Sequence, residues 1–112
     1  MGKYTPKKGD FIFAVFDPQS GHEQKGRRPA LVISNTLFNE RTGLAIVCPI
    51  TNTNKGNPFH LAVDGHPKVT GVVMVDQVKS IDYSSRKAKF IAVASGSLVK
   101  DVLELLDELI KP

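Results

Sequence analysis

Residues 30–50, ALVISNTLFNERTGLAIVCPI, decide the fold class of this chain. They contain two apolar runs rich in β-branched residues, ALVIS (30–34) and LAIVCPI (44–50). Short apolar runs of this composition are typical of buried β-strands. The segment between them, NTLFNERTG (35–43), consists largely of turn-forming polar residues and leaves room for a helical turn. The stretch therefore predicts two core strands joined by a short connection.

Further apolar runs lie on both sides of this pair. The run FIFAVF (11–16) has aromatic and aliphatic residues on both faces, as a buried strand has. Downstream, FHLAV (59–63), GVVMV (71–75) and FIAVA (90–94) are also predicted strands. The segment between the last two, DQVKSIDYSSRKAK (76–89), is interpreted as a connection that contains a basic turn. We therefore expect five to seven short strands.

The C-terminal segment changes to helical periodicity. Apolar residues recur at helical spacing while carboxylates occupy the other face; the apolar residues are Leu98, Val102, Leu105, Leu106 and Leu109. Ser97 is the predicted N-cap, and Pro112 ends the chain. Together these patterns predict a mainly β fold with one C-terminal helix, a small and strongly bent β-barrel that forms a single domain over residues 1–112.

Composition and cysteine usage narrow the class of protein. The 112 residues are 41% hydrophobic and 23% charged, which is the profile of a soluble globular domain. The single cysteine, Cys48, is expected to be a small buried residue, and it allows neither an internal disulfide nor a thiolate zinc site. A reducing cytoplasm fits this usage. We predict no export signal and no membrane span.

The charge is unevenly distributed along the chain. Residues 98–112 carry two cations and four carboxylates, whereas the first 97 residues carry 13 cations and seven carboxylates. A basic body with an acidic C-terminal element suggests a polyanionic partner for the body. A solvated, lysine-rich surface is the simpler alternative.

The segment GHEQKGRRP (21–29) carries more charge than a turn between strands requires. We interpret it as a loop that holds phosphate and acts on it chemically. It is not a P-loop, because it lacks the GK[ST] ending and no helix is predicted after it. The histidines His22, His60 and His66 show no metal-binding spacing, so neither a metal nor a cofactor is predicted. His60 is expected to be a satisfied surface or core residue, and His66 to form a turn.

Three residues could support RNA cleavage without a metal. Such cleavage needs a proton acceptor, a proton donor and a fixed positive charge near phosphorus. The guanidinium group of Arg28 is planar and permanently charged, and Pro29 restricts the backbone of Arg28. Glu23 could be a base or could orient Arg28, and Thr51 could donate to a phosphate. The alternatives are a surface ion pair between Glu23 and Arg28, which spacing alone favours, and a threonine that satisfies its own turn.

Other cations and aromatic residues could contact a nucleic-acid strand. The cations are Lys25, Arg27, Lys55, Lys79, Arg86, Lys87 and Lys89. Lysines in loops are more often simply solvated. Phe59 and Tyr83 could stack on unpaired bases, although Phe59 fits a core position equally well.

The chain resembles the MazF/PemK-type toxins, the ribonuclease components of bacterial toxin–antitoxin pairs. The resemblance extends nearly from end to end. It rests on the segments YTPKKGD, FDP, GHEQKGRRPALVIS, CPIT, NKGNPF and GVVMVDQVKSID. It implies an SH3-like barrel closed by a C-terminal helix, which functions as a homodimer. The implied activity is metal-independent cleavage of single-stranded mRNA at a short sequence, leaving 2′,3′-cyclic phosphate and 5′-hydroxyl ends and inhibiting translation and growth.

The resemblance also implies roles for individual residues. Arg28, Thr51 and Glu23 fall on the catalytic positions of the family. Segments that line the RNA groove include Gln24, Lys55, Phe59, Asp76, Gln77 and Lys79, to which we add the neighbouring cations Lys25 and Arg27. The implied partner, besides RNA, is a MazE-like antitoxin with an acidic, largely disordered tail that occupies the same groove.

One position departs from the family pattern. Some relatives have a histidine immediately before the catalytic arginine, where this chain has Arg27. We expect the proton transfer to pass to Arg28, Thr51 or Glu23, with His22 as a hypothetical substitute.

Two other classes of function are weaker alternatives. Topoisomerase poisons share this architecture but bind gyrase through a C-terminal end that includes tryptophan, and this chain has no tryptophan. A non-catalytic RNA-binding barrel would need the cations, but it would need neither Thr51 nor Glu23.

Overall fold

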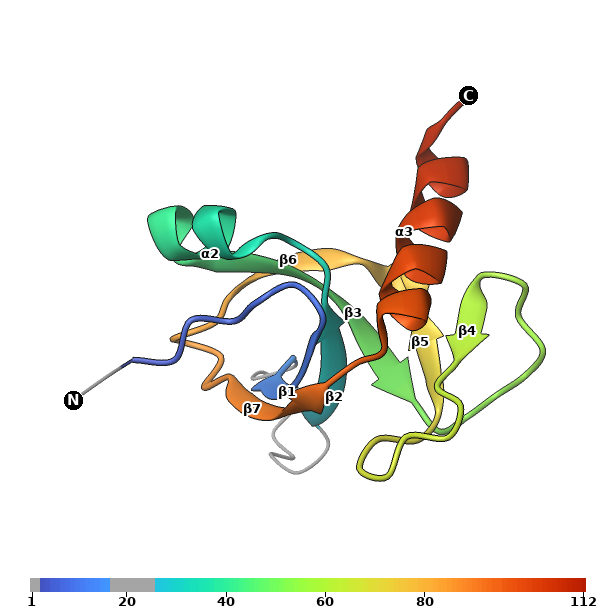
Figure 1. Cartoon of the computed structure of the whole chain (residues 1–112), viewed down its shortest axis with the longest axis horizontal. Coiled ribbons are helices and arrows are strands. Elements are labelled where there is room, and N and C mark those ends of the chain that lie inside the picture. The colour runs from blue at the N-terminus through green and yellow to red at the C-terminus, as the bar shows by residue number, and fades with distance from the viewer. Residues whose placement is uncertain (1–2, 17–25) are drawn as a thin grey trace.

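The computed structural model of the protein describes residues 3–16 and 26–112. In chain order the elements are β1 (Asp10–Val15), β2 (Arg27–Val32), α2 (Thr36–Thr42), β3 (Leu44–Thr51), β4 (His60–Ala62), β5 (Val72–Met74), the 3-10 turn η1 (Val75–Gln77), β6 (Lys79–Asp82), β7 (Lys89–Val93) and α3 (Gly96–Ile110) (Figure 1). The mainly β fold with a C-terminal helix is therefore confirmed. No helix within the described ranges has both the length and the apolar character needed to cross a membrane.

The strands form one antiparallel sheet in the order β4-β5-β3-β2-β1-β7, with β6 also paired to β3. One edge of β3 pairs with β2. Its other edge pairs first with β6, over Leu44–Val47, and then with β5, at Ile50 and Thr51. Among the described residues no strand pairing joins β7 to β4 or β6, so hydrogen bonds do not close the sheet into a continuous barrel.

Two details of the sequence analysis were wrong. The segment KSID forms strand β6, not part of a connection. Only Ile81 of its four side chains is buried, so the strand lacks an apolar run. The N-cap of α3 is Ser95 rather than Ser97, because the Ser95 backbone is extended and its Oγ accepts a hydrogen bond from the Leu98 amide at 3.1 Å. Ser97 lies inside the first turn of the helix.

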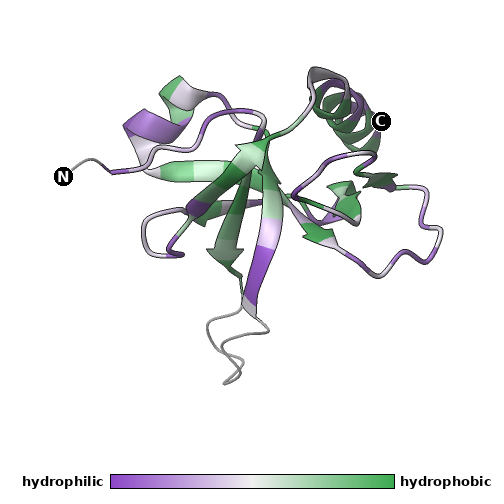
Figure 2. Ribbon diagram, turned by 60° about the horizontal axis from the view of Figure 1, so that its bottom comes forward, coloured by the Kyte–Doolittle hydropathy of each residue, from purple (hydrophilic) through white to green (hydrophobic). Residues whose placement is uncertain are grey.

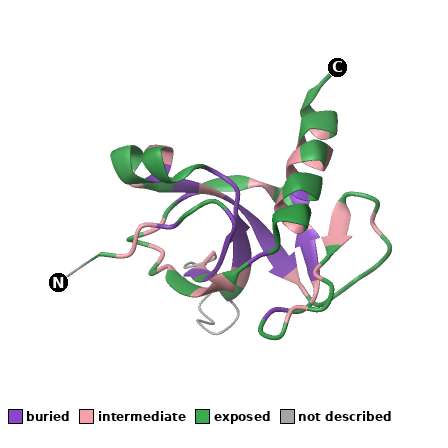
Figure 3. Ribbon diagram, in the orientation of Figure 1, coloured by how far each residue is buried: buried purple, intermediate pink, exposed green. Residues whose placement is uncertain are grey.

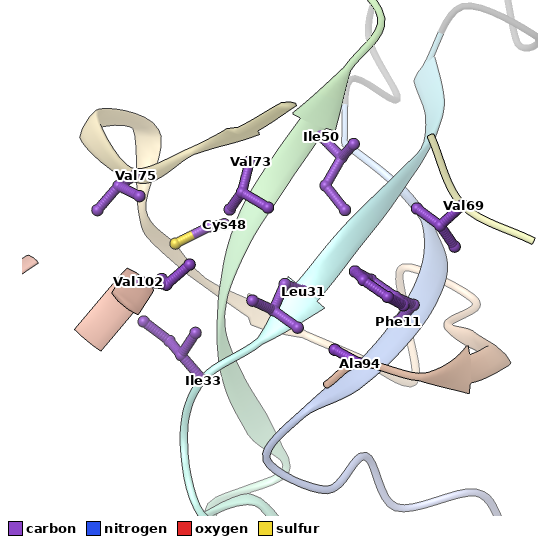
Figure 4. Close-up of a cluster of buried hydrophobic side chains, with 10 residues drawn as sticks. All are labelled: Phe11, Leu31, Ile33, Cys48, Ile50, Val69, Val73, Val75, Ala94 and Val102. Carbon is purple, nitrogen blue, oxygen red and sulfur yellow. The ribbon is translucent and has the colours of Figure 1, made fainter. Parts of the chain in front are cut away.

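Alternate residues of the central strands supply two hydrophobic clusters. One cluster lies under α3 and contains Phe11, Leu31, Ile33, Cys48, Ile50, Val69, Val73, Val75, Ala94 and Val102 (Figure 4). The other lies on the opposite face of these strands and contains Ile12, Ala14, Ala30, Val32, Ala45, Val47 and Ile81. Figure 3 shows the buried residues concentrated in these central strands. The apolar face of α3 packs on the first cluster as its periodicity predicted.

Cys48 and His66 behave as the sequence indicated. Cys48 is fully buried, and burial together with the negative charge of Asp76 raises the pKa of its thiol to about 12. The thiol is therefore neutral and unreactive near neutral pH. His66 Nδ1 accepts hydrogen bonds from the amides of Lys68 (3.1 Å) and Val69 (3.2 Å), which forms the predicted turn.

A buried polar cluster attaches α2 to the sheet. The side chain of Asn39 is fully buried, and its Nδ2 donates to the Pro6 carbonyl at 2.8 Å. Its Oδ1 accepts from Ser34 Oγ, which in turn accepts from the Ile46 amide at 2.8 Å. Asn39 therefore joins the N-terminal segment, the end of β2 and strand β3.

Replacing Asn39 by alanine is expected to lower the free energy of unfolding by about 2–3 kcal/mol, because the Pro6 carbonyl and Ser34 hydroxyl lose their buried partner. Urea unfolding followed by circular dichroism measures this change. Glu40→Ala, at an exposed position of the same helix, serves as the control and should change stability by less than about 0.5 kcal/mol. Equal stabilities of the two variants would contradict the assigned role.

Candidate functional site

The register between β2 and β3 brings Arg28 and Thr51 together. The paired residues are Ala30 with Pro49, Leu31 with Cys48 and Val32 with Val47. Two residues beyond the Ala30–Pro49 pair, the same register sets Arg28 opposite Thr51. Opposed residues of antiparallel strands have side chains on one face, so these two side chains lie on the same side as Ala30 and Pro49.

Arg28 and Thr51 line one cavity, of about 490 Å³, which we call the Arg28–Thr51 pocket. Its lining residues are Phe16, Arg28, Pro49, Thr51, Met74, Gln77 and Lys79. The polar residues come from the start of β2, the end of β3, η1 and the start of β6. Figure 2 shows hydrophobic colour along the central strands and hydrophilic colour where β2 begins. The pocket therefore combines an apolar wall with a few convergent polar groups, as ligand sites do.

The pocket carries positive charge. Its described lining includes the cations Arg28 and Lys79 and no carboxylate. The Lys79 ammonium lies 5.3 Å from the centroid of the Phe16 ring, a distance typical of a cation–π contact. A second cavity, of about 270 Å³ at the N-terminus of α3, is lined by Asp64 and Asp101 instead and suits a polyanion poorly. Only the first of these two cavities matches phosphate.

The Thr51 hydroxyl takes part in its own turn and can still donate. Its Oγ1 accepts a hydrogen bond from the Thr53 amide at 3.2 Å. The alternative that this threonine satisfies its own turn is therefore correct. A hydroxyl that accepts one hydrogen bond retains its own proton for another partner.

Gly71 fits closely against the backbone of Thr51. Its φ is +112°, and a Cβ at this position would lie 2.4 Å from the Thr51 carbonyl oxygen. The conformation and the close contact both require glycine here. Gly71 therefore helps to define where the end of β3, and with it Thr51, lies.

Several candidate residues lie away from the pocket lining. Arg27 follows the β2 alternation to the opposite face from Arg28, where its guanidinium lies 5.2 Å from the centroid of the Phe13 ring. Lys55 and Phe59 are exposed on the connection between β3 and β4, and Asp76 lies in η1 beside His60. Of the predicted residues that the structure describes, Arg28, Thr51, Gln77 and Lys79 share the pocket.

The predicted residues of the segment 17–25 lie outside the described part of the chain. They are Glu23, Gln24 and Lys25, together with His22. The roles assigned to them, and the ion pair between Glu23 and Arg28, stay predictions.

Arg86 and Tyr83 have structural contacts. Arg86 Nη1 donates to the carbonyls of Val15 (3.3 Å) and Phe16 (3.4 Å), and the Tyr83 hydroxyl donates to the Asn39 carbonyl at 3.0 Å. These contacts attach the turn between β6 and β7 to the end of β1 and to α2.

The apolar part of the pocket is not predicted from the sequence. Phe16, Pro49 and Met74 all belong to runs that the sequence predicts to be strands, and nothing in their composition marks them as lining a site.

His60 is predicted from the sequence to be a satisfied residue. Its Nε2 lies 3.1 Å from Asp76 Oδ1, but its buried Nδ1 has no hydrogen-bond partner among the described residues. The expectation was correct for one of the two ring nitrogens.

Within the described ranges, no three acidic, histidine or cysteine side chains gather to hold a metal ion.

Known proteins match almost the whole chain. A family model for the PemK-like, MazF-like toxin of type II toxin–antitoxin systems matches residues 7–110. The endoribonuclease toxin MazF of Escherichia coli K12 is 38% identical over 106 residues, which cover 95% of this chain and 91% of that protein.

Solved structures agree with this match. MazF from Deinococcus radiodurans superposes with a TM-score of 0.87 at 42% identity, covering 96% of this chain and 98% of that one. A MazE–MazF structure from the same organism gives a TM-score of 0.85 at 36% identity, covering 96% and 97%. From the matched range and these identities, the chain belongs to the PemK-like, MazF-like toxin family of type II toxin–antitoxin systems.

Proposed function

We propose that this protein is the toxin of a type II toxin–antitoxin system and a metal-independent endoribonuclease that cleaves single-stranded mRNA in the Arg28–Thr51 pocket. The observation that carries the proposal is the convergence of Arg28, Thr51 and Lys79 in one cationic cavity. Membership of the toxin family and the similarity to a relative named as an endoribonuclease support it.

The reaction is an internal transesterification. The ribose 2′-oxygen attacks the adjacent phosphorus, the bond from phosphorus to the 5′-oxygen breaks, and a 2′,3′-cyclic phosphate and a 5′-hydroxyl result. One proton leaves the 2′-hydroxyl and one reaches the departing 5′-oxygen. Because the nucleophile belongs to the substrate, the protein has to orient the phosphate, stabilise its charge and move two protons.

Arg28 is the main catalytic residue in this proposal. Its guanidinium can bind two non-bridging phosphate oxygens and stabilise the charge that develops on them. The Thr51 hydroxyl donates to the same phosphate, and Lys79 supplies a second positive charge. Arg27 lies over Phe13 on the other face, so proton transfer falls to Arg28, Thr51 or Glu23, with His22 as the hypothetical substitute.

The pocket suits an unpaired nucleotide. Phe16 and Met74 offer apolar surface to a base or ribose, and Gln77 offers both donors and acceptors to a base edge. We assign further RNA contacts to Gln24, Lys25, Lys55, Phe59 and Asp76, which would extend the groove beyond the pocket, and a separate contact to Arg27 on the opposite face of β2.

The same cationic pocket suits an acidic peptide. We infer that a MazE-like antitoxin neutralises the toxin by placing an acidic segment there, and a solved complex of a relative with MazE supports this partner. We further infer a homodimer, for which exposed apolar residues such as Phe90, Val93 and Ile110 provide area to bury. The cytoplasm is the inferred site of action, because it contains mRNA.

Cleavage in EDTA, with long single-stranded RNA as substrate, tests the proposed function. Wild-type protein is expected to cut at one short recurring sequence and leave 5′-hydroxyl ends, which end mapping detects. Arg28→Ala should reduce the rate at least 100-fold, because the charge on the transition state loses its main partner. Arg41→Ala, an exposed arginine on α2, is the matched control and should cleave like wild type. Intact RNA from a folded wild-type protein would instead indicate a binding module.

Two substitutions separate the contribution of the Thr51 hydroxyl from the contribution of the side chain's size and shape. Thr51→Val keeps the size but removes the hydroxyl, so we expect kcat/KM to fall about 10- to 100-fold. Thr51→Ser retains the hydroxyl and should stay within about threefold of wild type. Equal cleavage rates of the two variants would exclude a hydroxyl contact to the phosphate.

Gly71→Ala is expected to impair both stability and cleavage. The added Cβ would displace the Thr51 carbonyl, and alanine is strained at a φ of +112°. The free energy of unfolding should therefore fall by about 2 kcal/mol. Because Thr51 is displaced, kcat should fall as well. Gly65→Ala is the control, since its φ of +68° is also positive but nothing lies within 4 Å of the added Cβ. It should lose about 1 kcal/mol of stability and keep its cleavage rate. A Gly71→Ala protein with the wild-type kcat would show that Thr51 does not depend on this contact.

A further inference from the structure

His60 and Asp76 form an ion pair or hydrogen bond beside the pocket that the proposed chemistry does not use. His60 Nε2 lies 3.1 Å from Asp76 Oδ1, and the two side chains are 12% and 36% exposed. His60 begins β4, where it pairs with Met74, and Asp76 is the middle residue of η1. Gln77, the next residue, lines the pocket. The pair therefore links the β4–β5 hairpin to the turn from which Gln77 enters the pocket.

The backbone on both sides of this pair is well fixed. The His60 amide donates to the Asn57 carbonyl at 3.1 Å, and the Val75 amide donates to the Phe59 carbonyl at 3.1 Å. The Val78 amide closes η1 on the Val75 carbonyl at 3.2 Å. With both backbones fixed, the contact between the two side chains determines the orientation of the Asp76 carboxylate.

The imidazole has no polar role besides this contact. A carboxylate only accepts hydrogen bonds, so Nε2 carries the hydrogen that faces Asp76. Nδ1 is buried and has no partner among the described residues. Buried polar atoms usually have a hydrogen-bond partner, so a histidine with a purely structural role would have both ring nitrogens bonded. The hydrogen bond to Asp76 is therefore the one polar interaction of the His60 side chain with a described residue.

A carboxylate at this position needs an explanation. Asp76 directly precedes Gln77 in a region where Arg28 and Lys79 supply positive charge for phosphate. A carboxylate repels phosphate, so it favours RNA binding only where it meets hydrogen-bond donors. The donors that RNA bases present are N–H groups, above all the exocyclic amino groups of adenine, cytosine and guanine. Asp76 Oδ2 makes no hydrogen bond to a described residue, and its side chain is partly exposed.

We propose that Asp76 reads an amino-bearing base of the RNA next to the cleaved phosphate, and that His60 is the positioning residue that orients its carboxylate. The proposal rests on the endoribonuclease function proposed above and adds a specificity determinant to it. His60 occupies one carboxylate oxygen, so the other is presented to the base in a fixed direction.

The test compares substrates that differ by one amino group. Once the cut sequence is known, each of its bases is replaced by the analogue without that group: purine riboside for adenosine, inosine for guanosine, and 2-pyrimidinone riboside for cytidine. At one position, wild-type kcat/KM should fall about tenfold or more on removal of the amino group. Asp76→Asn and His60→Leu should each reduce this ratio at least threefold, and the double variant should reduce it no further than Asp76→Asn does.

Conservative variants separate orientation from bulk. A glutamine amide can reach Asp76 from position 60, whereas an asparagine amide is too short, so His60→Gln should keep the wild-type ratio and His60→Asn should lose it. This pair also serves if His60→Leu does not fold. Asp64→Asn removes an exposed carboxylate elsewhere on the β4–β5 hairpin and should leave the ratio unchanged.

The outcomes separate this inference from the proposed function. Wild-type protein that leaves all RNA intact overturns the proposed function and this inference with it. Wild-type cleavage with an unchanged ratio in Asp76→Asn, or with equal ratios in His60→Gln and His60→Asn, overturns the inference alone.

Discussion

The pairing of β3 with three other strands is the constraint on which the rest of the structure depends. One edge of β3 is paired to β2, while the other passes from β6 to β5 along its length. In this chain the two neighbours on that edge, β5 and β6, are consecutive in the sequence and are joined by a short turn. That turn is η1, which lies between β5 and β6 and contributes Gln77 to the pocket. The strand that organises the sheet therefore also positions the site.

The apolar clusters hold this arrangement rigid. Phe11, Leu31 and Val73 are fully buried on one face of the strands, and Ile12 and Val47 are fully buried on the other. A strand packed on both faces cannot shift its register by one residue without exposing one set of side chains and burying the wrong one. The polar residues at the strand ends thus have fixed positions relative to one another, as catalysis by orientation requires.

The Asp76 carboxylate acts on a buried core residue and also contacts a histidine side chain. Its negative charge, added to burial, raises the pKa of Cys48, so the carboxylate acts on the first cluster as well as on the surface. The contact with His60 places a hydrogen-bond donor on the same carboxylate. This contact keeps the carboxylate in a defined direction, which a freely rotating surface aspartate would not have.

Most strands could be predicted from the sequence because each depends on local composition. Taken together, the runs FIFAVF, ALVIS and LAIVCPI bury most of their side chains, so their β-branched and aromatic residues identify them. Strand β6 buries only Ile81 and depends on its pairing with β3, which no local pattern records. The chemistry of RNA cleavage points to Arg28 and Thr51 as candidates, but the family resemblance is needed to prefer a catalytic role, because spacing alone favours a surface ion pair for the arginine. The contact between His60 and Asp76 joins residues 16 positions apart and depends on the turn at η1.

Pro29 lies where the backbone pairing between β2 and β3 ends, next to Arg28. The pairing between β2 and β3 ends at Ala30 and Pro49, and Pro29 is the next residue of β2. Pro29 has no amide hydrogen, so it cannot donate the hydrogen bond that would continue this ladder beyond Leu31 and Cys48. Within the described residues, the pairing between β2 and β3 does not continue past Ala30 and Pro49. Arg28 and Thr51 are the first residues on one face past the end of the ladder, which leaves an arginine and a hydroxyl at an opening between two firmly held strands. Pro29 therefore has two effects in this chain, because it restricts the backbone of Arg28 and also withholds a hydrogen-bond donor where the pairing of β2 with β3 ends.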